Sequence, residues 1–402
     1  MVSSNTPALG IGGGKFAPVA SSLIIADLQS HATGGHFSIW LNRTVKESLK
    51  HFGRLSVYVA DEGSVPDLAF LDSRDRERIS IVLIPKIYRE KRFAGDILEV
   101  ISRHHETETN DAHCAPLFLM WAQQYLERNL IFPPLKSWLP WKQNLRFARS
   151  WGSLSSISSV VHEESTAPMM EKRIHDFVTS HPPCEAVFLW DEYGVRKFGS
   201  KYIYLPNVEP LGSDFDWEMP RVGPVTIGSV GQLWGYRSMN LLAEIMNSDQ
   251  DLKGYAGGVL RWNSYAPDTI LLLSRDNGRF LLEEGFVESD SALNQRLQKL
   301  DAFVLDSRSY KCPSGLGIRA MSMGRPIIAV DSPSWIATLI KEEGVGILWQ
   351  AEEVRLTEKL RDWYASGGSK RSKEAARRLS DQRGLERAYA TMFERLTKAV
   401  KH

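Results

Sequence analysis

The stretch Ser314-Gly-Leu-Gly-Ile-Arg-Ala-Met-Ser-Met-Gly-Arg-Pro-Ile-Ile-Ala329 opens with a glycine-containing turn, continues into a helix that contains Met321, and ends in an apolar strand at Pro326–Val330. Gly315 and Gly317 suit the turn because glycine adopts backbone conformations that other residues resist. A helix that leads into a buried strand is the building unit of a parallel sheet covered by helices. This stretch therefore predicts an α/β fold.

The same alternation of strands and helices occurs throughout the chain. A helix with Phe37, Leu41 and Val45 at helical spacing follows the first strand, and other helices are predicted near 93–103, 114–129 and 237–247. The remaining predicted strands are Ser22–Leu28, Leu55–Ala60, Ile79–Ile84, Ile157–Val161, Ala186–Trp190, Tyr202–Leu205, Val225–Val230, Thr269–Leu273 and Ala302–Leu305. The pattern predicts two doubly wound, Rossmann-like domains that face each other across a cleft. In such sheets, ligands bind at the carboxyl ends of the strands.

The chain length and the position of a glycine- and proline-rich segment suggest how the domains divide. A chain of 402 residues is long enough for two domains of ordinary size. Residues 208–224 have no apolar period and read as a linker. The predicted division is a flexible tail at 1–20, an acceptor-binding domain at 21–207, the linker, a nucleotide-sugar-binding domain at 225–384, and a helix at 385–402 that packs back on the first domain.

Composition and charge limit the partners and the location. The chain has 49 basic and 48 acidic residues, so its net charge of +1 argues against a nucleic-acid partner. Cys114, Cys184 and Cys312 form no metal-binding or disulfide pattern. We see no secretory signal, and no apolar run approaches the roughly 20 residues that span a bilayer. These features predict a cytoplasmic protein, either soluble or peripheral on the inner face of the membrane.

Motifs of the second half resemble the donor-binding domain of the large retaining glycosyltransferase family 4, which has the GT-B fold. The resemblance rests on the order and spacing of Thr226-Ile-Gly-Ser-Val-Gly-Gln-Leu-Trp-Gly-Tyr-Arg237, Glu284-Gly-Phe-Val287, Leu300-Asp-Ala-Phe-Val-Leu-Asp-Ser307 and the Ser314–Ala329 stretch. It implies a hexosyltransferase-like enzyme of polysaccharide biosynthesis. Such an enzyme moves a sugar from a nucleotide diphosphate sugar, its co-substrate, to a glycan or lipid-linked acceptor.

Two departures from the family pattern concern the donor site. The family commonly has paired glutamates eight residues apart, near the donor sugar and the ribose, and here Lys311 and Arg319 take those positions. Gln232 replaces the arginine of the family's glycine loop, and Arg237 matches its lysine. These replacements leave the donor sugar and the stereochemical outcome open.

The predicted donor site centres on the helix that follows Ser314. The start of a helix presents free N–H groups and partial positive charge, which suit a diphosphate. Arginine adds charge-assisted hydrogen bonds. The predicted donor-binding residues are Gly34, Gly35, Gly231, Gln232, Arg237, Lys311, Ser314, Gly315, Gly317 and Arg319. The alternative interpretation is that the glycines only serve tight turns and the basic residues are solvated.

The predicted catalytic residues are His162, Glu163 and Asp27. The resemblance implies that His162 lies near the donor sugar, and a histidine at a strand's carboxyl end can bond a hydroxyl or move a proton near neutral pH. Glu163 and Asp27 are candidate bases for an inverting reaction. Alternatively, His162 is a core residue and Glu163 begins a solvated helix. No acidic triplet for a metal–nucleotide complex stands out, so no obligatory metal is expected.

An aromatic and basic stretch at residues 131–151 suggests a contact with a membrane or an acceptor. It interleaves Trp138 and Trp141 with Lys142 and Arg146. Aromatic and basic side chains together suit the headgroup region of an anionic membrane. The other interpretation is an aromatic core segment with solvated bases.

Two other functions fit the same fold. A sugar-nucleotide epimerase would turn over its nucleotide sugar without an acceptor, and a non-catalytic relative would bind it without turnover. The replacement of an acid by Lys311 keeps the second alternative open. A dinucleotide oxidoreductase fits less well, because Gly10-Ile-Gly-Gly-Gly14 precedes the first strand instead of following it.

Overall fold

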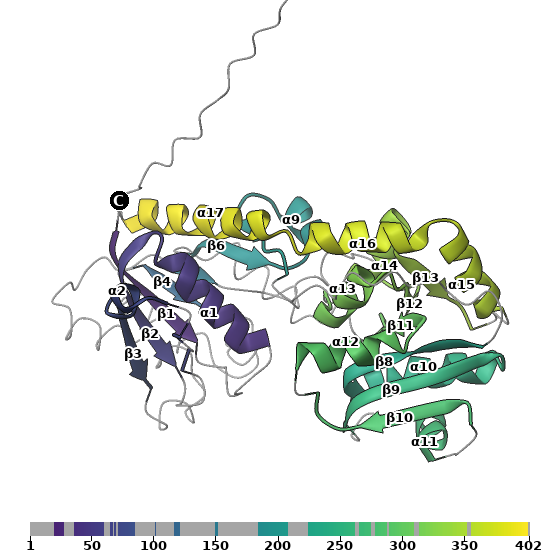
Figure 1. Ribbon diagram of the computed structural model, residues 1–402. Helices are drawn as coiled ribbons and strands as arrows, with labels where there is room; N and C mark the ends of the chain where they lie inside the picture. The colour runs from purple at the N-terminus through teal and green to yellow at the C-terminus, as the bar shows by residue number, and fades with distance from the viewer. Residues whose placement is uncertain are drawn as a thin grey trace, which may run out of the picture.

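The computed structural model describes residues 20–27, 36–59, 65–66, 68–69, 71–84, 101, 116–120, 149–151, 184–207, 224–261, 265–274, 278–287, 289–308, 313–351 and 355–400. These residues form two parallel sheets, each with its own helices (Figure 1).

The first sheet has the strand order β3-β2-β1-β4-β5-β6-β7, and all its neighbouring strands pair in parallel. Its strands are β1 (Ala20–Asp27), β2 (Phe52–Val59), β3 (Ile79–Leu83), β4 (Leu117–Leu119), β5 (Arg149–Trp151), β6 (Cys184–Leu189) and β7 (Tyr202–Tyr204). The described helices between them are α1 (His36–Ser48), α2 (Ser73–Arg76) and α9 (Glu192–Phe198).

The second sheet has the order β10-β9-β8-β11-β12-β13 and is also parallel throughout. Its strands are β8 (Val225–Trp234), β9 (Leu252–Arg261), β10 (Phe280–Glu284), β11 (Ala302–Val304), β12 (Ile327–Val330) and β13 (Gly346–Trp349). Its helices are η3 (Gly235–Arg237), α10 (Met239–Ser248), α11 (Pro267–Ser274), α12 (Asp290–Gln298), α13 (Gly315–Ser322), α14 (Trp335–Glu343), α15 (Leu356–Ala365) and α16 (Gly368–Leu379). The last helix of the chain, α17 (Gln382–Val400), packs on the first sheet.

Both sheets are doubly wound, as predicted. The strand order reverses between β1 and β4 in the first sheet and between β8 and β11 in the second. Such a reversal point opens a crevice beyond the carboxyl ends of the strands, where ligands of this architecture bind. The topology therefore places one candidate ligand crevice on each sheet.

The central strands β11 and β12 of the second sheet are buried on both faces, which explains why they read as continuous apolar runs. Phe303 and Ile327 belong to the core on one face, whereas Val304 and Ile328, the next residues along, belong to the core on the other. Successive side chains of a strand point to opposite faces, so both must be apolar here.

Two predicted elements are wrong. Thr269–Leu273 was predicted as a strand but lies in α11, where Thr269 and Leu272 are buried one helical turn apart. A short apolar run has no period long enough to distinguish a strand from a helix. The helix predicted near 114–129 is contradicted by β4, a buried central strand. The predicted strand at Ile157–Val161 lies outside the described residues.

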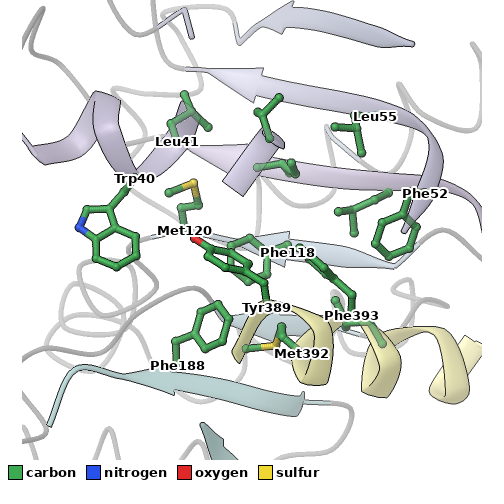
Figure 2. Packing of buried hydrophobic residues seen from close by; sticks show 14 of the residues in the cluster. Trp40, Leu41, Phe52, Leu55, Phe118, Met120, Phe188, Tyr389, Met392 and Phe393 are labelled. Carbon is green, nitrogen blue, oxygen red and sulfur yellow. The ribbon is translucent and has the colours of Figure 1, made fainter. Parts of the chain in front are cut away.

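The C-terminal helix α17 completes the core of the first domain (Figure 2). It contacts helix α1 and strands β5, β6 and β7 of the first sheet. The Phe393 ring meets Phe52 edge-on at 5.3 Å, and the Tyr389 ring meets Phe188 edge-on at 5.1 Å. The Tyr389 hydroxyl also shares a buried hydrogen bond of 2.8 Å with Thr44 Oγ1. A helix after the second sheet is therefore part of the first domain's core.

Three further contacts join the halves near the start of α17. The backbone N–H of Asn207 donates to the carbonyl of Leu379 at 2.9 Å. Arg378 at the end of α16 donates to both carboxylate oxygens of Glu192 in α9. Tyr193 of α9 is buried in the core of the second half. Figure 1 shows α16 and α17 (yellow) running from one half to the other beside α9.

Candidate functional site

A pocket lies between the two halves, at the carboxyl ends of both sheets. Its volume is about 550 Å³, including space open to solvent. It is lined by Trp40, Trp190 and Tyr204 from the first half, and by Gly315, Ile318 and Trp335 from the second. Trp190 follows β6, and its ring stacks on Trp40 at 5.4 Å. The pocket therefore occupies the position where doubly wound sheets bind ligands.

Two helices begin at this pocket. Ser314 caps α13, and its hydroxyl accepts a hydrogen bond from the N–H of Gly317 at 3.2 Å. Ser334 caps α14 in the same way, through the N–H of Ala337 at 3.2 Å. First-turn N–H groups have no partner within a helix, and they carry the positive end of its dipole. Both helix starts therefore favour a negatively charged group in the pocket.

The cap assigns different roles to the two glycines predicted for the donor site. Gly315 lines the pocket and is the first residue of α13. Gly317 is buried, and its N–H is engaged by Ser314 Oγ. The cap therefore uses the Gly317 N–H, and the donor-binding role of Gly317 stays a prediction. An added Cβ at Gly317 would lie 3.3 Å from Ser314 Cβ, so a side chain there would crowd the cap.

The switch point between β8 and β11 carries a cluster of charged residues. Arg237 ends η3, directly after β8, and its carbonyl accepts a 2.6 Å hydrogen bond from the N–H of Asp306, just after β11. Arg308 bonds to Asp306 and to Glu244 of α10. The carboxylate of Asp306, followed by that of Glu244, raises the pKa of Arg308. Arg237 therefore follows β8, and its donor-binding role stays a prediction. The sequence gave no sign that Arg308 pairs with Asp306 and Glu244.

The prediction of a glycine loop at residue 231 disagrees with the structure. Strand β8 does not end at Val230 but pairs with β9 as far as Trp234. Gly231 lies inside this ladder with a φ of 102°, and the exposed Gln232 accepts a 3.1 Å hydrogen bond from the Trp234 indole. A bend at a positive-φ glycine can interrupt the apolar pattern without ending the strand.

Arg319 also differs from its prediction as a direct phosphate ligand. Its side chain is only 1% exposed, and two of its guanidinium nitrogens lie 2.8 Å from Oδ1 of Asp290. A buried guanidinium that already binds a carboxylate does not present itself to a phosphate in an open pocket. The residue follows the glycine turn as predicted, but helix α13 turns its side chain inward, toward α12.

The chain is similar to known proteins in its structure but not in its sequence. No protein-family model matches the chain, and no curated protein matches its sequence. Sucrose-phosphate synthase from Thermosynechococcus elongatus superposes with a TM-score of 0.61 at 14% identity, over 94% of this chain and 100% of that one. HepE from Anabaena, solved with UDP and glucose, gives 0.53 at 12% identity, over 95% and 99%.

The lipopolysaccharide outer core galactosyltransferase WaaB gives a TM-score of 0.53 at 13% identity, over 95% of this chain and 99% of that one. The solved neighbours share two Rossmann-like domains. The chain has the GT-B fold. At this level of identity the likeness concerns the fold, and the matched lengths show that it covers both domains.

Several predicted site residues of this GT-B chain lie outside the described residues. They are Gly34, Gly35, Trp138, Trp141, Lys142, Arg146, His162, Glu163 and Lys311. Asp27 is described and is fully buried at the carboxyl end of β1. The roles of all these residues stay predictions. The end of the aromatic stretch, at residues 149–151, forms β5, which lies between β4 and β6 in the first sheet of the GT-B fold.

Asp191 is a titratable group that the sequence did not single out. It caps α9, with Oδ1 accepting from the N–H of Tyr193 at 2.9 Å, and it follows Trp190 of the pocket. Its side chain is 1% exposed, and Oδ2 has no partner among the described residues. Burial raises the pKa of Asp191 to about 7, although the N–H groups of Gly194 and Tyr193 act in the opposite direction. The sequence feature that could have identified Asp191 is its position directly after the predicted strand Ala186–Trp190.

Within the described part of the chain, no three His, Cys, Asp or Glu side chains gather as a metal site would require. None of the described helices combines the length and apolar character needed to cross a bilayer.

Proposed function

We propose that this protein is a glycosyltransferase that moves a sugar from a nucleotide diphosphate sugar to an acceptor. The observation that carries the proposal is the start of α13, where Gly315 lines a pocket at the carboxyl ends of both sheets of a GT-B fold. The structural neighbour HepE, with UDP and glucose, supports this choice of ligand class. The nucleotide sugar is a co-substrate, and the proposal includes no obligatory cofactor or metal.

In the proposed reaction, the nucleoside diphosphate leaves the sugar carrying additional negative charge. The free N–H groups at the start of α13 and the guanidinium of Arg237 stabilise that charge. Removing one such donor from an active site typically costs about 3–4 kcal/mol of transition-state stabilisation. In this proposal Ser314 positions the helix start, and His162, Glu163 or Asp27 acts on the sugar or the acceptor.

Nucleotide binding tests the proposal directly. We expect UDP, GDP or ADP, or a corresponding nucleotide sugar, to raise the melting temperature, because a ligand at 100 times its Kd stabilises the folded state by about 2.7 kcal/mol. Arg237→Ala is expected to weaken that binding roughly ten- to hundredfold, through the loss of a charge-assisted hydrogen bond. Arg355→Ala is the matched control, since Arg355 is exposed and does not line the pocket. A protein that binds no nucleoside diphosphate or nucleotide sugar, with the panel extended to CDP and dTDP, contradicts the proposal.

A non-catalytic nucleotide-sugar-binding protein is the second candidate. The observation that favours it is the buried Arg319–Asp290 pair at a position where the resembled family has an acid. The two candidates differ in turnover. Release of nucleoside diphosphate that depends on an added acceptor supports the enzyme, binding without release supports the second candidate, and turnover without an acceptor supports an epimerase.

We further propose that the acceptor is a lipid-linked or cell-surface glycan precursor, met at the inner face of the membrane. Support comes from the aromatic and basic residues Trp138, Trp141, Lys142 and Arg146, and from the structural neighbour WaaB, a lipopolysaccharide galactosyltransferase. We expect the protein to co-sediment with vesicles that contain anionic lipid, and Lys142→Ala with Arg146→Ala to reduce the bound fraction. Neutral vesicles are the control. A protein that stays in the supernatant with anionic vesicles contradicts the membrane contact.

A further inference from the structure

Exposed apolar side chains gather at one edge of the second sheet. The described part of the chain exposes seven large apolar side chains, and four of them lie on or beside β10. They are Ile270 and Leu271 of α11, Leu281 of β10, and Phe286 shortly after it, with exposed fractions between 45% and 76%. Figure 1 shows α11 beside β10 at this edge. Exposed apolar side chains that gather in this way mark an interaction surface.

The backbone of β10 can pair with a further strand. Among the described strands, β10 is the last of the second sheet, and β9 is its one neighbour. The N–H of Gly254 in β9 donates to the carbonyl of Arg279 at 2.8 Å, and every second residue of a strand directs its backbone groups to the same side. The residues whose N–H and C=O groups point away from β9 are therefore Phe280, Leu282 and Glu284. Such an edge is a template for another strand.

The charges along β10 favour a second copy of the same strand. Arg279 precedes the strand, and Glu283 and Glu284 end it, with apolar residues between them. A second copy in the antiparallel direction brings its basic start beside the acidic end of the first, whereas a parallel copy would bring like charges together. Within its own chain, Arg279 bonds to Gln250 and Glu283 bonds to Lys299, so both charges are held at this edge.

The apolar side chains select one register for such a pair. A twofold axis can pass through Leu281 or through Leu282, and residues opposite each other then lie on the same face of the sheet. An axis at Leu282 would place Leu281 opposite Glu283. An axis at Leu281 places the two exposed Leu281 side chains against each other and sets Arg279 opposite Glu283. Leu282 already packs against the core of its own chain. The axis at Leu281 is therefore the register that matches both apolar and charged groups.

Helix α11 supplies apolar groups for the other face of this junction. Leu272 of α11 and Leu282 of β10 pack in the same core, so α11 covers the face opposite to Leu281. An axis perpendicular to the sheet leaves α11 of both copies on one face, on either side of the junction. Ile270 and Leu271, which α11 exposes beside β10, then cover the junction from that face. Both faces of the paired strands would be apolar.

We infer that β10 pairs with β10 of a second copy of this chain, antiparallel about a twofold axis at Leu281, so that the two second sheets form one continuous sheet. A symmetric dimer of this kind uses the same surface on both copies and is the commonest oligomer of soluble proteins. The inference goes beyond the proposed function and does not depend on it, because none of the residues at this edge lines the pocket.

Sedimentation velocity of the full chain over a range of protein concentrations tests the dimer. We expect the wild-type protein to dimerise, and Leu281→Lys to raise the dimer Kd at least about tenfold, because it opposes two ammonium groups and removes two apolar contacts. Leu83→Lys is the matched control, since Leu83 is also an exposed leucine on an edge strand, β3 of the first sheet. It is expected to keep the wild-type Kd. Circular dichroism reports whether each variant is folded.

A cysteine at the axis tests the register and decides the question if Leu281→Lys does not fold. Residues opposite each other in an antiparallel pair have Cβ atoms about 4.5–5.5 Å apart, a separation from which a disulfide can close. Leu281→Cys is therefore expected to form a covalent dimer under mild oxidation. Leu83→Cys is the matched control, and the wild-type chain reports any reaction of its own three cysteines.

Three results overturn the inference. The first is a wild-type protein that stays monomeric at every concentration, including one that pairs this edge with a different protein. The second is a folded Leu281→Lys variant that dimerises as tightly as the wild type, because the dimer then uses another surface. The third is a Leu281→Cys variant that forms no more covalent dimer than Leu83→Cys. Each of these results leaves the proposed function standing.

Discussion

Phe393→Ala is expected to lower the free energy of unfolding of the first domain by about 3–5 kcal/mol, the usual range for a buried phenylalanine. The Phe393 side chain is fully buried and packs against Phe52, Phe118 and Tyr389, with ring centroids 5.3, 6.1 and 5.8 Å away. Removing the ring leaves a cavity among aromatic side chains that cannot collapse to fill it. The loss is measurable by urea denaturation followed by circular dichroism.

The control for this prediction is Glu394→Ala, the neighbouring residue on the exposed face of α17. Its ion pair with Lys398 is exposed at both ends, so its removal is expected to change the stability far less than the Phe393 substitution does. Equal effects of the two substitutions would mean that α17 does not form part of the first domain's core in solution.

Asp191→Asn is expected to stabilise the protein above neutral pH and to flatten its pH profile. The folded-state pKa of Asp191 is raised to about 7, whereas an aspartate in an unfolded chain titrates near 3.9. Between about pH 4 and pH 7 the Asp191 carboxyl is ionised in the unfolded chain but still protonated in the folded protein. The stability that this group contributes to the folded protein is therefore fully present below about pH 4 and is lost as the pH rises toward 7. The loss is roughly 4 kcal/mol when complete, at about 1.4 kcal/mol per pKa unit.

Asparagine keeps the oxygen that accepts from the N–H of Tyr193 but cannot ionise. Urea denaturation from pH 4 to pH 8 should therefore show the wild-type protein losing stability relative to the variant. Asp72→Asn is the control, since Asp72 caps α2 through the N–H of Asp75 but is exposed. If the Asp191→Asn and wild-type profiles run parallel over this range, the buried carboxyl does not titrate in it.

The candidate site was predictable where it depended on residues close together in sequence. Ser314 and Gly315 were identified because a helix start directly after a glycine turn is a local pattern, and the structure places Gly315 at the pocket. Trp335 and Asp290 were missed. Each begins a helix, yet nothing nearby in the sequence shows that Trp335 reaches the pocket or that Asp290 reaches Arg319.

The sequence by itself determined the α/β class and the parallel order of alternating strands and helices. The strand at Ile327–Val330 and the helix start at Ser314–Gly317 depend on a few neighbouring residues, so both can be predicted from the local sequence. The sequence also predicted that a C-terminal helix packs back on the first domain, but only the tertiary structure decided which of its side chains enter the core. The same holds for the inward direction of Arg319, toward Asp290, and for the alignment of three glycines across β8, β9 and β10. These contacts depend on the register of distant strands and on the rotation of each helix about its axis, which are set when the separate elements pack together.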